Sequence, residues 1–204
     1  MMDTEEFNEI LSLSEKLCTK MSHDLSGASM SVSNSIEMLE DESFKDSATD
    51  IAKRGAFSLA SKIKFFRLAF GTMGSDLKTE EFFNIINNYL LGVSQKGEFD
   101  FEQGLTLNAK ETKILFNALI FVVSLLGSKF LIKLCKEDEK IIVKVQNMRV
   151  IMLQNDIEVK GNDIFFNEVN SNNSPLYLSK ILAKLYGKQL KMNVNENLLN
   201  IVIE

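Results

Sequence analysis

The sequence predicts an α+β fold in which a long helical hairpin precedes an α/β sandwich, with helices on one face of a sheet. Three observations support this prediction. Apolar residues in the first third of the chain recur with a helical period, whereas those in the last third alternate with the period of strands. Helices and strands also mix in the second part without strict β-α-β alternation. Of the 204 residues, 45% are hydrophobic, which is enough for a sizeable core.

The N-terminal segment carries apolar or small residues at alternating steps of three and four, the pattern of one long helix. These positions are Leu11, Ser14, Cys18, Met21, Leu25, Ala28, Val32, Ile36 and Leu39. Asp3 and Glu6 have the spacing of a capping box at its start. The pattern breaks at the acidic run 40–42. A helix of roughly 38 residues would be about 57 Å long.

A second helical pattern follows after only a few residues. Its positions are Ala48, Ala52, Gly55, Leu59, Ile63, Phe66, Phe70 and Met73. Ser47 with Asp50 is expected to begin this helix, and Gly71 and Gly74 to end it. Because the connection is short, we expect the two helices to run antiparallel, with a turn centred on residues 44–45.

Two such helices cannot cover both of their apolar flanks with each other. This favours a homodimer in which two hairpins form a four-helix bundle. The alternative is that the hairpin packs on the rest of its own chain.

From about Lys78 the pattern changes, and the boundary is expected at the linker 71–78. We therefore predict a helical hairpin domain over residues 1–75 and an α/β sandwich domain over residues 76–204. Helices are expected at 79–91, 108–127 and 174–187, the second of them capped by Asn108 and Glu111. Strands are expected at 98–101, 105–107, 129–136, 140–147, 188–194 and 198–203, with one or two more within 149–166.

The charge and the cysteines limit the class of protein. A net charge of -5 disfavours a nucleic-acid binder, which would carry a basic face. Cys18 and Cys135 lie far apart in the sequence and are interpreted as reduced thiols. The apolar run 114–126 is too short to span a bilayer, and the N-terminus is acidic, unlike a signal peptide. These features predict a cytoplasmic protein without a membrane segment.

The single histidine, His23, is the candidate nucleophile. It lies two residues from both Met21 and Leu25, so helical geometry directs its side chain away from the apolar stripe and towards solvent. A neutral imidazole is a competent nucleophile. Asp24 is expected to accept a hydrogen bond from one ring nitrogen and leave the other free to attack. The alternative is an exposed histidine without a function.

The residues around His23 suggest a docking surface. The candidates that flank it on its exposed face are Thr19, Lys20, Ser26, Gly27 and Met30. The expected turn places Phe66 level with His23, so Lys64 and Arg67 are expected at the same height, where they would meet an acidic partner or a phosphoryl group. The alternative for both is a solvated helix face.

Two segments resemble a known family. The segment 22–25, Ser-His-Asp-Leu, followed by 34–39, Asn-Ser-Ile-Glu-Met-Leu, resembles the dimerisation helix of bacterial histidine kinases. It is still more similar to alphaproteobacterial histidine phosphotransferases of the ChpT type. The C-terminal segments 175–178 and 181–190 are similar to the end of that family's second domain, which itself resembles the ATP-binding domain of histidine kinases.

The chain departs from the kinase pattern where ATP would bind. After Gly127 it has only Gly161 and Gly187, whereas the kinase domain needs glycine-rich turns that approach the phosphates closely. The strand 145–149 contains neither an acid nor a glycine. Asn117 is either a relic of a metal-binding asparagine or, as we favour, a helix-face amide. Gly27 stands where kinases with phosphatase activity carry a hydroxyl or an amide, which argues against a strong phosphatase role.

The resemblance implies a histidine phosphotransferase that shuttles a phosphoryl group between receiver-domain aspartates through phospho-His23. It implies no ATP, no bound cofactor and no metal, with Mg²⁺ supplied by the partner receiver. The implied partners are the receiver domains of response regulators and of a hybrid kinase. Two alternatives remain open: a non-catalytic module that sequesters a regulator or a kinase, and an active ATP-dependent kinase.

Overall fold

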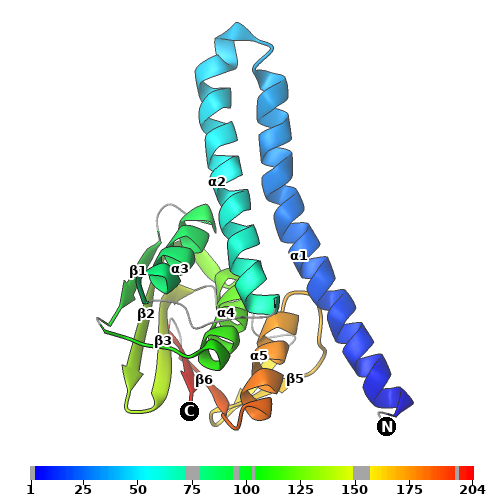
Figure 1. Cartoon of the computed structure of the whole chain (residues 1–204), viewed down its shortest axis with the longest axis vertical. Helices are drawn as coiled ribbons and strands as arrows, with labels where there is room; N and C mark the ends of the chain where they lie inside the picture. The colour runs from blue at the N-terminus through cyan, green and yellow to red at the C-terminus, as the bar shows by residue number, and fades with distance from the viewer. Residues whose placement is uncertain (1–2, 72–78, 94–96, 103, 149–156, 196–197) are drawn as a thin grey trace.

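Two long antiparallel helices extend from one side of a sheet that is covered by shorter helices (Figure 1). The computed structural model describes residues 3–71, 79–93, 97–102, 104–148, 157–195 and 198–204. Its order of elements confirms the predicted α+β class, with a helical hairpin first and a mixed sheet after it.

Helix α1 (Thr4–Met38) begins with the predicted capping box. The main-chain N–H of Glu6 donates to Asp3 Oδ1 at 2.8 Å, and the N–H of Asp3 donates to Glu6 Oε2 at 3.2 Å. These bonds satisfy two of the N–H groups that have no partner at the start of a helix.

Helix α2 (Lys45–Phe70) follows a short 3₁₀ turn, η1 (Glu42–Phe44). It starts before the predicted Ser47, whose hydroxyl donates back to the carbonyl oxygen of Phe44 at 2.9 Å instead of accepting from an N–H as a cap would. Gly71 follows the last helical residue, as predicted. Gly74 and most of the predicted linker lie outside the described residues.

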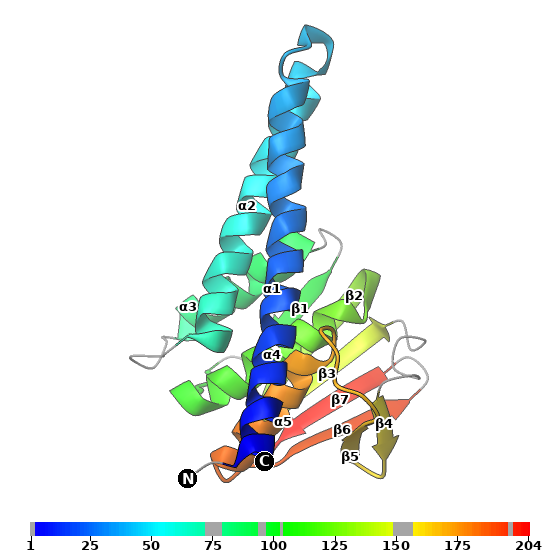
Figure 2. The same cartoon turned by 90° about the vertical axis from the view of Figure 1, so that its right-hand side faces the viewer.

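The two helices touch closely near the middle of the hairpin. A Cβ atom added at Gly55 would lie 2.9 Å from Cγ2 of Val32. Only glycine permits this approach without a shift of the neighbouring helix. In Figure 2, α1 continues well past the end of α2, so its first turns have no α2 residues beside them.

The main sheet has five strands in the order β1-β2-β3-β7-β6. Their bounds are β1 (Glu98–Phe101), β2 (Leu126–Glu137), β3 (Lys140–Met148), β7 (Leu198–Ile203) and β6 (Leu190–Asn195). Strand β1 pairs parallel with β2, and every other pair is antiparallel. The strands β4 (Ile157–Lys160) and β5 (Asp163–Phe166) form a separate hairpin. They fall in the segment where one or two strands were predicted, although residues 149–156 lie outside the described residues.

Helices cover one face of this sheet, as predicted (Figures 1 and 2). Alternate residues of the central strand β3, namely Ile141, Val143 and Val145, are fully buried on that face. The covering helices are α3 (Thr79–Val93), α4 (Ala109–Ser124) and α5 (Ser174–Leu185). The Ser179 hydroxyl on α5 donates to the Ile114 carbonyl on α4 at 2.8 Å, which fixes the two helices together.

Two predicted boundaries in this half are wrong. Residues 105–107 form no strand: the N–H of Leu105 donates to the Glu102 carbonyl in a turn, and Gly104 has a φ of 80°. Leu105 and Leu107 are apolar because their side chains pack on the hydrophobic core and hold this connection in place. They do not belong to a paired strand. Helix α4 keeps its predicted Asn108–Glu111 capping box but ends at Ser124, because β2 already begins at Leu126.

The end of α2 belongs to the same hydrophobic core as the second half of the chain. The ring of Phe65 stacks on Tyr89 of α3 at a centroid distance of 3.9 Å and lies 4.4 Å from the ring of Phe116 of α4. The predicted domain boundary at residue 75 lies outside the described residues, and the packing on its two sides is continuous. Across the described residues, no helix has both the length and the apolar character needed to cross a membrane.

Candidate functional site

His23 projects from the middle of α1 with 86% of its side chain exposed, as its helical phase predicts. Its Nδ1 lies 3.4 Å from Oδ1 of Asp24, a long contact for a hydrogen bond. A contact of this length is common at catalytic groups before a partner binds. When Nδ1 carries the proton, Nε2 keeps its lone pair on an exposed ring.

An open groove surrounds His23 on this face of α1. It is lined by Cys18, Thr19, Ser22, His23, Ser26, Gly27 and Met30. The groove therefore brings together Thr19, Ser26, Gly27 and Met30, all predicted as docking residues. A Cβ atom added at Gly27 would meet nothing within 4 Å, so this part of the groove is open to a partner.

Lys20 does not line this groove with the other predicted docking residues. Its side chain is only 12% exposed, and its Nζ lies 3.1 Å from both carboxylate oxygens of Asp24. Asp24 is itself only 17% exposed. The ion pair follows from the i,i+4 spacing of the two residues on one helix. The prediction of Lys20 as a docking residue did not consider this pairing.

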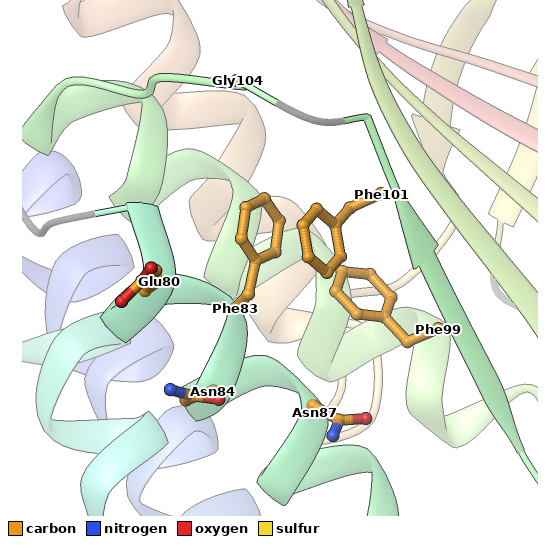
Figure 3. A pocket seen from close by; sticks show the side chains of 7 residues that line it. All are labelled: Glu80, Phe83, Asn84, Asn87, Phe99, Phe101 and Gly104. Atoms are coloured by element: carbon orange, nitrogen blue, oxygen red, sulfur yellow. The ribbon is translucent and has the colours of Figure 1, made fainter.

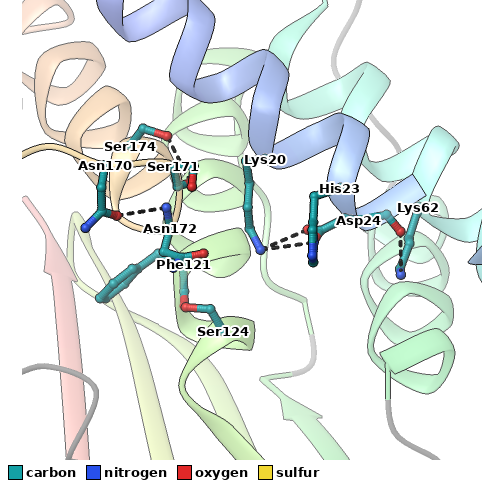
Figure 4. A network of polar contacts seen from close by, with 10 residues as sticks. All are labelled: Lys20, His23, Asp24, Lys62, Phe121, Ser124, Asn170, Ser171, Asn172 and Ser174. Atoms are coloured by element: carbon teal, nitrogen blue, oxygen red, sulfur yellow. Dashed lines mark hydrogen bonds and ion pairs between the residues drawn. The ribbon is translucent and has the colours of Figure 1, made fainter. Parts of the chain in front are cut away.

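A second lysine reaches the same turn from α2. Lys62 donates from Nζ to the main-chain carbonyl oxygen of Asp24 at 2.9 Å. Figure 4 shows Lys20 and Lys62 on opposite sides of Asp24, with the His23 ring beside them. Burial lowers the pKa of Lys62, while the charge of Asp24 opposes that shift and the charge of Lys20 adds to it. Sequence reasoning missed Lys62, because its contact depends on how α2 is registered against α1.

This register leaves Lys64 within about one residue of the height of His23, as expected, and places Arg67 about one helical turn away. Because Asp24 is level with Lys62, His23 is level with residues near Ile63, about one helical turn from Phe66. The expected turn centre was displaced because α2 starts directly after the 3₁₀ turn. Lys64 Nζ lies 3.8 Å from Oε1 of Glu81 on α3, so this lysine is paired with an acidic residue of its own chain. Arg67 is exposed on α2, so its proposed role as a docking residue stays a prediction.

A further hollow lies between α3 and β1, and its chemistry differs from that of the groove (Figure 3). Phe83 and Phe101 stack there at a centroid distance of 3.4 Å, with Phe99 beside them. Glu80, Asn84 and Asn87 line its other side along α3. None of its described lining residues is a histidine, cysteine or lysine, whereas the groove on α1 contains the histidine.

Asn117, favoured as a helix-face amide over a relic of a metal-binding asparagine, lies on α4. It is fully buried, and its Nδ2 donates to the carbonyl oxygens of Ala69 and Lys113, each at 2.9 Å. Within the described part of the chain, no group of three or more histidine, cysteine, aspartate or glutamate side chains is arranged to hold a metal ion.

Comparison with known proteins points in one direction. No family model matches the chain. The curated protein phosphotransferase ChpT of Brucella abortus (strain 2308) is 29% identical over 114 residues, which are 54% of this chain and 54% of that protein. A solved structure described as a bacterial phosphotransferase matches with a TM-score of 0.73 at 19% identity, over 100% of this chain and 98% of the other.

This chain is similar to histidine phosphotransferases of the ChpT type. The curated ChpT match covers about half the length of each protein, and the solved structure carries the same fold over the whole chain. A histidine kinase domain from Erythrobacter litoralis EL346 also aligns, with a TM-score of 0.41 and 11% identity over 91% of this chain and 94% of that one. The curated ChpT match and the phosphotransferase structure confirm the resemblance to the ChpT type expected from the sequence.

Proposed function

We propose that this chain is a histidine phosphotransferase of a bacterial phosphorelay, in which His23 accepts a phosphoryl group from one receiver domain and passes it to another. The observation that carries this proposal is the exposed imidazole of His23, set in an open groove with a carboxylate at its Nδ1. The similarity to ChpT supports the same activity.

In the proposed reaction, the Nε2 lone pair attacks the phosphorus of the donor's aspartyl phosphate. The N–P bond forms as the P–O bond to the carboxylate breaks, and the bonding electrons leave with that carboxylate. Nδ1 keeps its proton throughout, so the phosphorylated ring is an imidazolium whose positive charge faces Asp24. The reverse step returns the phosphoryl group to the aspartate of a second receiver. Catalysis of this kind depends mainly on positioning and on charge stabilisation.

We propose that the phosphoryl group comes from another protein and not from ATP. The scarcity of glycines after Gly127 supports this, because a lid over phosphates needs positions without side chains. On this view the receiver brings its own Mg²⁺, and the chain holds no cofactor.

A homodimer completes the proposal. Large apolar side chains stay exposed along the hairpin, although they occupy the seam positions of the two helices. They include Leu11, Ile36, Leu39 and Ile63. A second hairpin packed on this surface would bury them in a four-helix bundle. The proposed partners are the receiver domains of response regulators and of a hybrid kinase, in the cytoplasm.

The test is transfer of labelled phosphate from a phosphorylated receiver domain to the full chain. The wild type should acquire an acid-labile, alkali-stable label, and His23→Ala and His23→Gln should acquire none. Exposed Ser33→Ala, on the same helix, is the matched control and should label like the wild type. Undiminished labelling of His23→Ala would refute the proposal. Receiver binding without any label on the wild type would favour a non-catalytic interaction module instead.

A further inference from the structure

Lys62 is a half-buried lysine on α2 whose only described hydrogen bond goes to the main chain of α1 next to the histidine. A lysine side chain loses considerable rotamer freedom when it is held in one place. Burial also lowers the pKa of Lys62, which means that its charged form is disfavoured there. An apolar residue would suit this half-buried position better, unless the ammonium group has a task.

That task is visible in what surrounds Asp24. The Lys20 ammonium holds the carboxylate from within α1, and the Lys62 ammonium holds the backbone carbonyl from α2. On α3, burial raises the pKa of Tyr89 and the charge of Asp24 raises it further, so the phenol stays protonated. One ammonium therefore holds the carboxylate of Asp24 and a second holds its main-chain carbonyl, and that carboxylate contacts Nδ1 of His23.

We propose that Lys62 is a positioning residue for phosphoryl transfer: it holds the Asp24 turn so that Asp24 accepts from Nδ1–H of His23 and leaves Nε2 as the nucleophile. This inference rests on the proposed function of His23. On this proposal, the packing of α2 against α1 decides which ring nitrogen of His23 attacks, because the Lys62 ammonium can reach Asp24 only in the observed register of the hairpin. The negative carboxylate of Asp24 and the positive ammonium groups of Lys20 and Lys62 together carry a net positive charge. The carboxylate therefore repels an incoming phosphoryl group less than it would alone.

The experiment compares wild type, Lys62→Met, Lys62→Arg and Lys53→Met in the full chain. Lys53 is an exposed lysine of α2 and serves as the matched control. We expect Lys62→Met to slow phosphohistidine formation about ten- to a hundredfold, the size of the loss seen when outer partners that orient metal-binding histidines are removed. Lys62→Arg should restore most of the rate, because a guanidinium also donates to the carbonyl. Lys53→Met should match the wild type, and circular dichroism should confirm that all four chains fold.

A second readout separates positioning from general damage. The chain has one histidine, so long-range ¹H–¹⁵N correlation spectra report the protonation of His23 alone. At a pH where the ring is neutral, the wild type and Lys62→Arg should show mainly the Nδ1–H form, and Lys62→Met a mixture of both tautomers. Unchanged rate and unchanged tautomer in Lys62→Met would overturn the inference while the labelled wild type upheld the proposed function. If the wild type acquired no label, the proposed function would fail, and the tautomer spectra would still decide the role of Lys62.

Discussion

Asn117 on α4 donates through Nδ2 to the carbonyl oxygen of Ala69, in the last turn of α2, at 2.9 Å. The last carbonyls of a helix have no partner within the helix, and this bond supplies a donor to one of them. Lys113, one turn earlier on α4, donates to the carbonyl of Gly71 at 3.1 Å in the same way. Helix α4 therefore donates to the last carbonyls of α2 and anchors the end of the hairpin.

Asn117→Ala should lower the free energy of unfolding by about 1–3 kcal/mol, because it leaves the Ala69 carbonyl buried without this donor. Urea denaturation followed by circular dichroism measures the change. Asn84→Ala, at an exposed position of α3, is the matched control and should stay within about 0.5 kcal/mol of the wild type. An equal loss in both variants would contradict this account of the anchor.

Two helical glycines should respond in opposite directions to the same substitution. Gly27→Ala should raise the free energy of unfolding by roughly 0.5–1 kcal/mol, because the added methyl group meets nothing and the helix gains propensity. Gly55→Ala should lower it by about 1–3 kcal/mol relative to Gly27→Ala, because its methyl group collides with the stiff side chain of Val32. Thermal and urea unfolding of both variants measure the difference, and stabilisation by both would show that the helices do not approach as described.

The proposed dimer should depend on the exposed seam of the hairpin. Ile36 and Ile63 are 57% and 51% exposed, and a charge at either place would be buried in a four-helix bundle. Ile36→Glu and Ile63→Glu should therefore shift sedimentation from dimer to monomer. Leu185→Glu, on the exposed surface of α5, is the control and should leave the sedimentation coefficient unchanged. A wild type that sediments as a monomer would rule out the dimer.

Stability should fall in acid partly through Glu204. Hydrogen bonds from Lys140, and then from Lys191, lower the pKa of its carboxyl from 4.5 to about 2. A folded pKa below the unfolded one stabilises the protein above pH 4.5, and this contribution is lost as the pH falls from 4.5 towards about 2. Urea midpoints at about pH 6 and about pH 2.5 should therefore differ less for Glu204→Gln than for the wild type. Exposed Glu40→Gln is the control, and a full acid loss in Glu204→Gln would disprove the assignment.

Local signals in the sequence predicted most of the elements. The capping pairs Asp3–Glu6 and Asn108–Glu111 were predicted from spacing alone, because each bond joins residues three apart in the chain. The error at residues 105–107 has the same origin, since two apolar residues in alternation look alike in a strand and in an anchored connection. Only the pairing partners distinguish them, and these lie far away in the sequence.

The sequence by itself determined the helical hairpin, the exposure of His23 and the neighbouring Asp24, because each depends only on the period of a helix and on adjacent residues. Only the tertiary structure decided which cations reach Asp24 and how the end of α2 is satisfied. Lys62 lies 38 residues from Asp24, and Asn117 lies 48 residues from Ala69. Contacts of this range depend on how helices pack against one another, and a shift of a single turn replaces one partner by another.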